Sequence, residues 1–365
     1  MSGFRPTSAQ VDLVAIRDNV RVLKPDGVEL MAVVKANAYG HGDVPVARAA
    51  LEAGATWLGV ALVEEGLALR MAGIEAPILV LSEVPAGSEA VALAHRLTPS
   101  LFTRSGLRRL ADAAPGRVAV HVKVDTGMHR VGVWPPEDAP GFVRDVTSAD
   151  LEVEGIFTHL ARSEDDEVTT KLQLERLGAV VEAVRASGIA PRYVHAANSG
   201  GLIRHHEAHL DMVRAGIAIY GIPPAPGVGD GLGLRPALSW RSSVGSIRRL
   251  DAGERLSYGH RYELDNPAWV ATVPVGYADG YPRRAWSTAE VLLGGRRRRI
   301  AGTVTMDQLM IDCGDDRPAE GDEVVLLGRQ GDEEITAWEL AEHAGTVGYE
   351  IVTRIGTRVP REYRG

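Results

Sequence analysis

Eight strand-like runs alternate with helix-like runs in the N-terminal two thirds of the chain. The strand-like runs occupy residues 30–34, 57–62, 77–81, 97–101, 118–124, 153–157, 193–197 and 211–220. Amphipathic stretches such as 46–53, 104–113 and 168–186 lie between them. Strict alternation predicts parallel strands joined by helices. Eight such units favour a closed (β/α)8 TIM-type barrel over an open doubly wound sheet, although periodicity alone does not show closure.

A cluster of proline and glycine at residues 223–231 ends this pattern. Beyond it, short β-rich runs dominate, for example at 238–247 and 269–275. We therefore expect an α/β chain of two domains, an N-terminal barrel over residues 1–230 and a C-terminal, mostly β domain over residues 231–365.

Charge and cysteine content exclude several classes of protein. The net charge of the 365 residues is −8, which argues against a nucleic-acid binder. Cys313 is the only cysteine, so an intrachain disulfide or a cysteine-based zinc site is excluded, and we expect no metal. No run approaches the roughly 20 apolar residues of a membrane span. The N-terminus has no apolar signal core, and we expect a cytoplasmic protein without membrane partners.

Lys35 ends the first strand-like run and precedes a polar loop that contains Gly40 and Gly42. Barrels place their chemistry at the carboxyl ends of their strands. Partial burial there makes the neutral, nucleophilic form of an amine accessible. A lysine that merely ends a strand and extends to water is the commoner case, so the motif needs support from the rest of the chain.

In the fifth run, valines alternate with Lys123 and Asp125, so the valines are expected to face the helices and Lys123 the barrel interior. A buried ammonium group requires a counter-charge or a modification. Arg130, in the following loop, is placed to bind an anion such as a carboxylate. From spacing alone, structural ion pairs are the simpler interpretation of these charges.

The ends of the seventh and eighth runs have the composition of an anion-binding site. Ser199 precedes two glycines, and Arg214 is followed closely by Gly216 and Ile217. Barrels often bind phosphate at the loops after these two strands, where glycine lets backbone N–H groups approach the oxygens. With Lys35, these residues meet the needs of pyridoxal phosphate, which are an amine for a Schiff base and a phosphate anchor.

The segment 33–42 resembles the cofactor-attachment signature of alanine racemases. Seven further segments resemble that family in the same order, namely 125–132, 158–160, 198–199, 214–217, 257–259, 306–308 and 349–350. The resemblance covers nearly the whole chain. It implies a barrel followed by a β domain, pyridoxal 5'-phosphate as cofactor, and interconversion of L-alanine and D-alanine. It also implies a head-to-tail homodimer in which each active site combines one barrel with the partner's β domain.

The resemblance further implies roles for single residues. Lys35 would attach the cofactor and act as one acid/base, and Tyr258 of the partner subunit would act as the other. Arg214 would face the pyridine nitrogen, with His159 beside it as a second source of positive charge. The phosphate would be held by Tyr39, Ser199, Gly216, Ile217 and Tyr349. The substrate carboxylate would be bound by Arg130, Met306 and Asp307. The entry path would be lined by Tyr277 and Arg283.

Lys123 matches a lysine that is carbamylated in some members of this family. A carbamate would turn an inward ammonium group into an anion that could orient Arg130. Two bases on opposite faces of the substrate, Lys35 and Tyr258, would explain racemisation most simply. Because arginine effectively keeps its proton, Arg214 would leave the pyridine nitrogen unprotonated and so disfavour transamination and decarboxylation.

Three other functions can be compared with these residues. A non-catalytic pyridoxal-phosphate-binding barrel would share Lys35 and the phosphate loops but would lack Tyr258 and the Met306 loop. A two-domain amino-acid decarboxylase would be expected to carry an acidic residue where Arg214 stands. Racemisation of serine, or of a broader range of amino acids, is not separated from alanine racemisation, because the width of the entry path cannot be read from sequence.

Overall fold

The computed structural model of the chain describes residues 4–365 and contains two compact units. The first unit consists of Ala15–Ala38 and Asp43–Arg235. The second contains Pro236–Gly365, the short segment Tyr39–Gly42 and the N-terminal segment that ends at Val14. No helix within the described residues is both long and apolar enough to cross a membrane.

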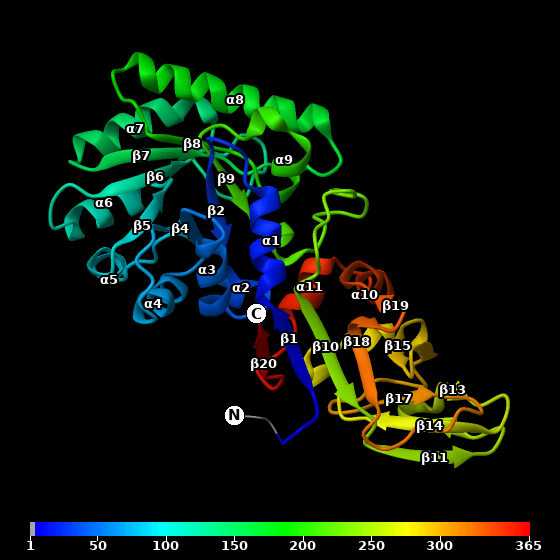
Figure 1. Cartoon of the computed structure of the whole chain (residues 1–365). Helices are drawn as coiled ribbons and strands as arrows, with labels where there is room; N and C mark the ends of the chain where they lie inside the picture. Colours follow the sequence, from blue (N-terminus) through cyan, green and yellow to red (C-terminus); the bar gives the residue numbers. More distant parts are fainter. Residues whose placement is uncertain (1–3) are drawn as a thin grey trace. The chain divides into compact units, whose positions relative to one another are not determined.

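The first unit is built on eight parallel strands (Figure 1). They are β2 (Glu29–Val33), β3 (Trp57–Val60), β4 (Ile78–Glu83), β5 (Leu97–Leu101), β6 (Ala119–Lys123), β7 (Glu152–Phe157), β8 (Tyr193–His195) and β9 (Met212–Ala215). From β2 to β8 each strand pairs with the next one in the chain, and β9 pairs with β2. The backbone N–H groups of Asp211 and Arg214 donate to the carbonyl oxygens of Val194 and Ala197 at 3.1 and 3.0 Å. These bonds close the sheet, which confirms the (β/α)8 barrel and shows that the open-sheet alternative was wrong.

Helices surround these strands in Figure 1. They are α1 (Leu13–Leu23), α3 (Asp43–Glu52), α4 (Val63–Met71), α5 (Glu89–Ala94), α6 (Arg104–Ala113), α7 (Ala139–Ser148), α8 (Glu167–Ala186) and α9 (Ser199–Arg204). Side chains cap several of their free N-terminal N–H groups. Thr103 caps α6, Asp166 caps α8 and Asn198 caps α9, each by accepting from a backbone N–H at 2.9 Å. The helix N-termini are therefore fixed by residues in the loops that leave the strands.

The barrel interior is filled by large side chains. One buried cluster combines Met31, Trp57, Leu79, Tyr193 and Met212, which come from five different strands. Side chains from strands around the whole sheet can meet only inside the closed barrel. The interior is therefore a packed core, as in other barrels of this type.

The eighth strand is shorter than its apolar run predicts. The run 211–220 was expected to form one strand, but β9 ends at Ala215 and the 3-10 helix η3 (Ile217–Tyr220) follows Gly216. The Tyr220 hydroxyl donates to the carbonyl oxygen of Val33 at 2.9 Å. The apolar residues of η3 are buried in a turn that packs beside the end of β2. The hydrophobic pattern of such a buried turn is the same as that of a buried strand, so periodicity does not distinguish them.

The second unit is mostly β, as predicted. Its largest sheet has the order β16-β15-β18-β10-β1-β20, with β19 paired to β18, and smaller sheets join β11-β14-β17 and β12-β13. The strands are β1 (Ser8–Asp12), β10 (Leu238–Ser243), β11 (Ser246–Leu250), β12 (Arg255–Leu256), β13 (Tyr262–Glu263), β14 (Ala268–Val273), β15 (Glu290–Leu293), β16 (Arg296–Arg299), β17 (Leu309–Asp312), β18 (Glu323–Gln330), β19 (Glu333–Ile335) and β20 (Arg361–Arg364). Two helices, α10 (Ala337–Ala344) and α11 (Gly348–Thr353), accompany them.

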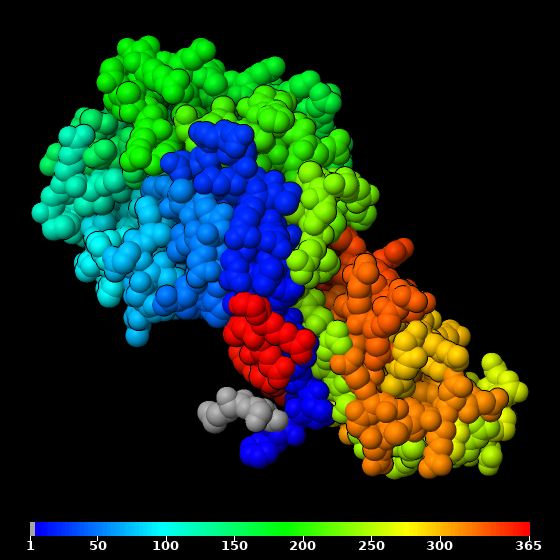
Figure 2. Space-filling model, viewed as in Figure 1, coloured from blue at the N-terminus to red at the C-terminus, as the bar shows by residue number. Residues whose placement is uncertain are grey.

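The N-terminal strand β1 belongs to this second unit. It pairs antiparallel with β10 and parallel with β20, so both ends of the chain enter one sheet. In Figure 2 the C-terminal segment, in red, lies against the dark blue atoms of the N-terminal segment. The residues after 236 therefore depend on the first strand of the chain to complete their sheet.

Candidate functional site

Lys35 lies two residues beyond the end of β2 and begins a short left-handed turn. The backbone φ angles of Ala36, Asn37, Ala38 and Tyr39 lie between 51° and 54°. L-residues avoid this region because Cβ approaches the following carbonyl oxygen, which costs about 1–2 kcal/mol per residue. Such a turn persists only where its surroundings hold it. It sets the direction in which the chain leaves Lys35.

Glu65, at the start of α4, holds this turn. One carboxylate oxygen, Oε1, accepts from the backbone N–H of Ala36 at 2.7 Å. The other, Oε2, accepts from the N–H groups of Ala61 and Leu62 at 2.8 and 3.1 Å. One side chain therefore ties the residue after Lys35 to the loop that follows β3.

Replacing Glu65 should loosen the turn without unfolding the barrel. In Glu65→Ala three backbone N–H groups lose the acceptor that links the turn to the loop after β3, so the left-handed conformation is no longer held from outside. We expect the amide of Ala38, which donates to the Val34 carbonyl at 2.8 Å, to exchange with solvent at least about tenfold faster. Hydrogen exchange measures this directly, with the exposed neighbour Glu64→Ala as the matched control. Equal exchange in both variants would show that Glu65 does not hold the turn.

The lip of the barrel carries several positive charges. Burial, followed by the charge of Arg130, lowers the pKa of Lys35, and Glu65 partly opposes this. Burial, followed by the charges of Arg130, Arg214 and Lys35, lowers the pKa of Lys123 to about 8. Both amines therefore lose their proton more readily than an exposed lysine does.

Lys123 points into the barrel, as predicted, but the predicted ion pair is absent. Its side chain belongs to a residue only 6% exposed, and its Nζ lies 5.5 Å from the centre of the Phe157 ring. Among the described residues, no carboxylate lies within ion-pair distance of Nζ. The Asp125 carboxylate instead accepts from the four backbone N–H groups of residues 127–130, at 2.9 to 3.0 Å.

Asp125 thus organises the loop that carries Arg130. Burial by itself would raise the pKa of Asp125, but the N–H donors of its own loop outweigh burial and lower it. The Arg130 side chain is exposed and makes no hydrogen bond or ion pair with the rest of the described chain. Its interpretation as one half of a structural ion pair was therefore wrong, and the guanidinium group is free to bind an anion.

Arg214, on β9, is held entirely by neutral acceptors. Its guanidinium donates to the carbonyl oxygens of Thr158 and Ala196 at 2.7 and 2.8 Å. It also lies 2.9 Å from Nδ1 of His195 and 3.4 Å from Nδ1 of His159. Burial lowers the pKa of Arg214 to about 9, which still leaves it protonated at neutral pH.

His159 is a neutral partner of Arg214 and does not add positive charge. Burial, followed by the charge of Arg214, lowers the pKa of His159 well below its ordinary value. The expectation that His159 is a second source of positive charge was therefore wrong. The Gln173 amide donates to the His159 carbonyl oxygen at 3.1 Å and so fixes the backbone at this position.

Ser199 and the start of η3 form a compact group of hydrogen-bonding atoms. The Ser199 hydroxyl oxygen accepts from the backbone N–H of Gly216 at 3.0 Å and of Ala218 at 3.3 Å. Ile217 lies between these two residues. A hydroxyl group and backbone N–H groups that converge in this way are suitable ligands for phosphate oxygens.

The second unit holds the remaining predicted residues. The rings of Tyr39 and Tyr349 lie 6.3 Å apart, and burial raises the pKa of Tyr39 to about 12. Gly40 packs so closely on α11 that a Cβ atom there would lie 2.2 Å from the Val352 carbonyl oxygen. The segment after the left-handed turn is therefore fixed against α11, and Tyr39 is brought next to Tyr349.

Tyr258 lies on the surface of the second unit and is 74% exposed. Its backbone is nevertheless well held, because the Thr303 hydroxyl donates to the Tyr258 carbonyl oxygen at 3.0 Å. Ser257 and Gly259, on either side, both have φ in the left-handed region. The backbone thus presents the tyrosine ring outward from a constrained loop.

A neighbouring loop pair presents Tyr277 and Met306. The N–H of Tyr277 donates to the Thr305 carbonyl oxygen at 3.0 Å. Gly276 permits this pairing, since a Cβ atom there would lie 2.2 Å from the Met306 carbonyl oxygen. Both Tyr277 and Met306 are exposed. Exposed apolar side chains gathered on constrained loops are typical of surfaces that meet another molecule.

The last two predicted residues are Asp307 and Arg283, which also lie in the second unit. The Asp307 carboxylate forms an ion pair with Arg358 at 2.7 Å. Arg283 begins the 3-10 helix η6 (Arg283–Ser287). The predicted residues thus fall into two sets. The first unit holds Lys35, Lys123, Arg130, His159, Ser199, Arg214, Gly216 and Ile217, and the second unit holds Tyr39, Tyr258, Tyr277, Arg283, Met306, Asp307 and Tyr349.

Two residues of the site were not predicted from the sequence, namely Glu65, which holds the turn after Lys35, and His195, which holds the Arg214 side chain. Glu65 is the third residue of α4, the position where a glutamate side chain commonly accepts from backbone N–H groups at a helix N-terminus, which could have drawn attention to it. His195 interrupts an apolar strand, and a polar residue there requires a partner. Neither signal indicates which residue Glu65 or His195 will contact.

Comparisons with known proteins agree over the length of the chain. The family model "Alanine racemase, N-terminal domain" matches residues 11–224, and "Alanine racemase, C-terminal domain" matches residues 237–363. An alanine racemase of Symbiobacterium thermophilum is 53% identical over 100% of this chain and 99% of its own length. One from Frankia casuarinae is 44% identical over 97% of this chain and 95% of its own length.

Solved structures give the same result. The alanine racemase of Streptomyces lavendulae matches with a TM-score of 0.95 at 40% identity, over 100% of this chain and 98% of that one. The alanine racemase of Bacillus anthracis, solved with bound L-Ala-P, matches with a TM-score of 0.95 at 39% identity, over 100% of this chain and 96% of that one. With both family models matched along nearly its whole length, this chain belongs to the alanine racemase family.

Proposed function

We propose that this protein interconverts L-alanine and D-alanine with pyridoxal 5'-phosphate as its cofactor. The observation that carries the proposal is the pairing of β2 with β9, in which Met31 lies opposite Arg214. This pairing places the strand that leads to Lys35 beside the strand that carries the buried guanidinium group. An amine with a lowered pKa and a protonated arginine therefore share one side of the barrel mouth.

The residues of the first unit fit this cofactor. Lys35 supplies the amine for covalent attachment. The hydroxyl of Ser199 and the backbone at Gly216 and Ile217 supply donors for the phosphate group, and Arg214 supplies a donor for the ring nitrogen. When bound, pyridoxal phosphate withdraws electrons from the amino-acid Cα and so makes its proton acidic. Tyr39 and Tyr349 are proposed to complete the phosphate site.

Two side chains are proposed to move the proton. Lys35 removes it from, or returns it to, one face of Cα, and Tyr258 of the partner subunit does so on the opposite face. The exposure of Tyr258 supports its proposed place in the partner's site, because a ring presented to solvent can enter the site of a second subunit. In this dimer the barrel, which lies within residues 1–230, holds the cofactor. The β domain, residues 231–365 together with the N-terminal strand β1, completes the partner's site.

Arg214 is proposed to limit the chemistry to proton transfer. It remains protonated at neutral pH and is fixed by four acceptors, so it presents an N–H donor to the ring nitrogen and leaves that nitrogen without a proton. Less negative charge is then withdrawn into the ring. Reactions that need stronger electron withdrawal, such as decarboxylation and transamination, are disfavoured.

The substrate carboxylate is proposed to bind between Arg130 and the backbone of Met306 from the partner subunit. The free guanidinium of Arg130 supports this, since it offers paired N–H donors that match a carboxylate. Because the Asp307 carboxylate pairs with Arg358, the proposed contribution of Asp307 is through its backbone and the shape of the loop. Tyr277 and Arg283 are proposed to line the path by which substrate enters.

We also propose that Lys123 is carbamylated. Its neutral amine attacks the carbon of CO2, an N–C bond forms, and one proton is released to solvent. The product is an anion, which removes the unpaired buried ammonium group and places a negative charge near Arg130. A carbamate requires the neutral amine, and the pKa of Lys123, about 8, makes that form available near neutral pH.

The carbamate can be detected without turnover. With 13C-bicarbonate in the buffer, we expect one protein-bound carbamate resonance that grows as pH rises through about 8, because deprotonation of Lys123 must precede the reaction. Lys123→Ala should lose the resonance, and the surface variant Lys171→Ala should keep it. Absence of the resonance at pH 9 from the protein without substitutions would contradict the proposal.

The activity itself is tested by circular dichroism with purified protein and either enantiomer of alanine. We expect the signal of L-alanine and of D-alanine to decay to the same racemic endpoint, only in the presence of pyridoxal phosphate. L-serine is the control for substrate breadth, and faster loss of its signal would reassign the substrate. Retention of both alanine signals would contradict the proposed function and leave a binding protein as the alternative.

A further inference from the structure

Two buried histidines connect Arg214 to a glutamate across the barrel interior. Arg214 lies 2.9 Å from His195 Nδ1, and His195 Nε2 lies 2.9 Å from His121 Nδ1. His121 Nε2 lies 3.6 Å from Glu154 Oε2 and has no hydrogen-bond partner within the described chain. Arg214 itself has no carboxylate within ion-pair distance among those residues. Glu154 is thus the carboxylate that this chain of contacts reaches.

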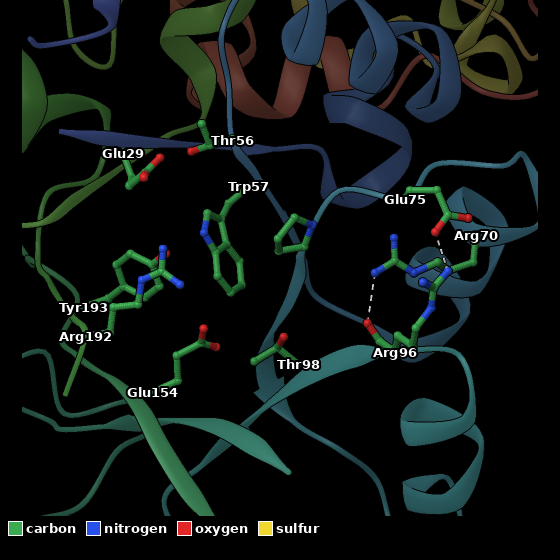
Figure 3. Close-up of a pocket in the computed structure, with 11 residues that line it drawn as sticks. Glu29, Thr56, Trp57, Arg70, Glu75, Arg96, Thr98, Glu154, Arg192 and Tyr193 are labelled. Atoms are coloured by element: carbon green, nitrogen blue, oxygen red, sulfur yellow. Dashed lines mark hydrogen bonds and ion pairs between the residues drawn. The ribbon is translucent and has the colours of Figure 1, made fainter. Parts of the chain in front are cut away.

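Glu154 lies where the interior meets solvent. It lines a cavity of about 460 Å³ at the amino ends of the strands, together with Glu29, Trp57, Thr98 and Tyr193 (Figure 3). In Figure 3 its carboxylate points into this cavity. The Glu154 side chain is 18% exposed, whereas that of His121 is fully buried. The carboxylate can therefore remain hydrated and charged while its oxygen faces the imidazole.

The two ends of this chain determine the direction of every hydrogen bond in it. A guanidinium group can only donate, so His195 Nδ1 must accept and its proton must be on Nε2. The His195 Nε2–H group then donates a hydrogen bond to His121 Nδ1. Because His121 Nδ1 accepts, the proton of neutral His121 must be on its Nε2. A carboxylate can only accept, and it ends the series. A rotation of Glu154 that shortens the 3.6 Å contact would complete the last hydrogen bond.

Among the described residues, the two histidine rings have no other hydrogen-bonding partners and are packed against aromatic rings. His121 is packed against the rings of Trp57 and Tyr193, with centroids 5.4 and 6.1 Å away, and His195 stacks on Phe157 at 4.8 Å. A Cβ atom at Gly155, on β7, would lie 2.5 Å from His121 Nδ1, so this strand needs glycine to admit the imidazole. Burial lowers the pKa of both histidines and keeps them neutral.

We propose that His121 and Glu154 are positioning residues for Arg214. They hold His195 in the tautomer that accepts from the guanidinium group, and Glu154 supplies the remote negative charge that balances it. The inference rests on the proposed role of Arg214 at the cofactor and extends it to residues at the far end of the barrel.

Two substitutions of His121 separate this role from simple packing. His121→Asn keeps an acceptor toward His195 and a donor toward Glu154, although it is much smaller than histidine. His121→Leu is nearer in size and has neither. We expect kcat for alanine to fall about tenfold or more in the leucine variant but only about threefold or less in the asparagine variant, because only leucine leaves His195 N–H unsatisfied. If the ring only fills space, leucine should be the better replacement.

The same comparison can be made at Glu154. Glu154→Gln keeps an acceptor oxygen for His121, whereas Glu154→Met has a similar length and no acceptor. We expect the methionine variant to lose activity several-fold more than the glutamine variant. Glu152→Met is the matched control, because Glu152 lies on the same strand and its exposed side chain forms an ion pair with the surface residue Arg117, at 3.7 Å.

Histidine tautomers give a readout that does not depend on turnover. In 15N-histidine-labelled holoenzyme, two-bond 1H–15N correlations should show His195 and His121 neutral and protonated on Nε2. The His195 N–H resonance should shift strongly in His121→Leu and much less in His121→Asn. A proton on Nδ1 of His195 would overturn the proposal even if His121→Leu did not fold. A protein that shows these tautomers but does not racemise alanine would reject the proposed function and keep this inference.

Discussion

Lys35→Ala should abolish both covalent attachment of the cofactor and racemisation. Borohydride reduction should fix pyridoxal phosphate to one peptide of the unmodified protein, the one that contains Lys35, and to none in the variant. Turnover in both directions should fall by more than about a thousandfold, because attachment and one proton transfer are lost together. Lys35 is suited to both tasks, since burial and Arg130 lower the pKa of its amine.

Two further variants make this result specific. Lys35→Arg keeps a positive charge at the barrel lip but offers no amine, so it should lose attachment as completely as alanine does. Lys171→Ala removes an exposed lysine that pairs only with Glu167 and should leave attachment and rate unchanged. Attachment that persists in Lys35→Ala would move the cofactor to another lysine, for which Lys123 is the buried alternative.

The barrel could be predicted from sequence because each strand and the helix after it form a local unit. The apolar runs and their spacing contain this information, and right-handed βαβ connections leave few arrangements for eight such units. The pattern does not show whether the sheet closes. Closure depends on hydrogen bonds from Asp211 and Arg214 to the carbonyl oxygens of Val194 and Ala197, and local sequence does not reveal which segments will pair.

The N-terminal strand shows the same limit more clearly. Residues 8–12 precede a strong amphipathic helix and were not predicted to form a strand. They become one because they pair with β10 and with β20, respectively some 230 and 350 residues away in the chain. Pairing between such distant segments is set by the tertiary fold and leaves little trace in local propensity.

The candidate site could be predicted from sequence only in part. Residues within motifs, such as Lys35, Ser199 and Arg214, could be named because the chemistry requires their types at those places. The groups that hold them, Glu65 and His195, could not, because each acts on a residue that another strand supplies. The left-handed turn after Lys35 was not predicted for the same reason, since alanine and asparagine have no conformational preference strong enough to indicate a left-handed turn.

Tyr258→Phe should leave the cofactor attached and remove most racemisation, mainly in the direction from L-alanine to D-alanine. The hydroxyl is lost, the ring is kept, and the loop is held through the Tyr258 carbonyl oxygen, which the substitution does not touch. One of the two proposed bases is then missing, and general acid–base catalysis is worth about 10²–10⁴-fold. Tyr262→Phe, which removes a hydroxyl bonded to Asp312 in the same unit, is the control and should remain active. Unchanged turnover in Tyr258→Phe would end the two-base proposal.

Mixing the two inactive variants tests whether the site is shared between subunits. In a mixed dimer of Lys35→Ala and Tyr258→Phe chains, one site carries both substitutions and the other carries neither. Random exchange makes half of the dimers mixed, so about a quarter of the original activity should return. If each chain used its own Tyr258, every site would contain one substitution and mixing would restore nothing. Activity that returns only after the subunits are allowed to exchange would therefore place Tyr258 in the partner's site and Lys35 opposite it.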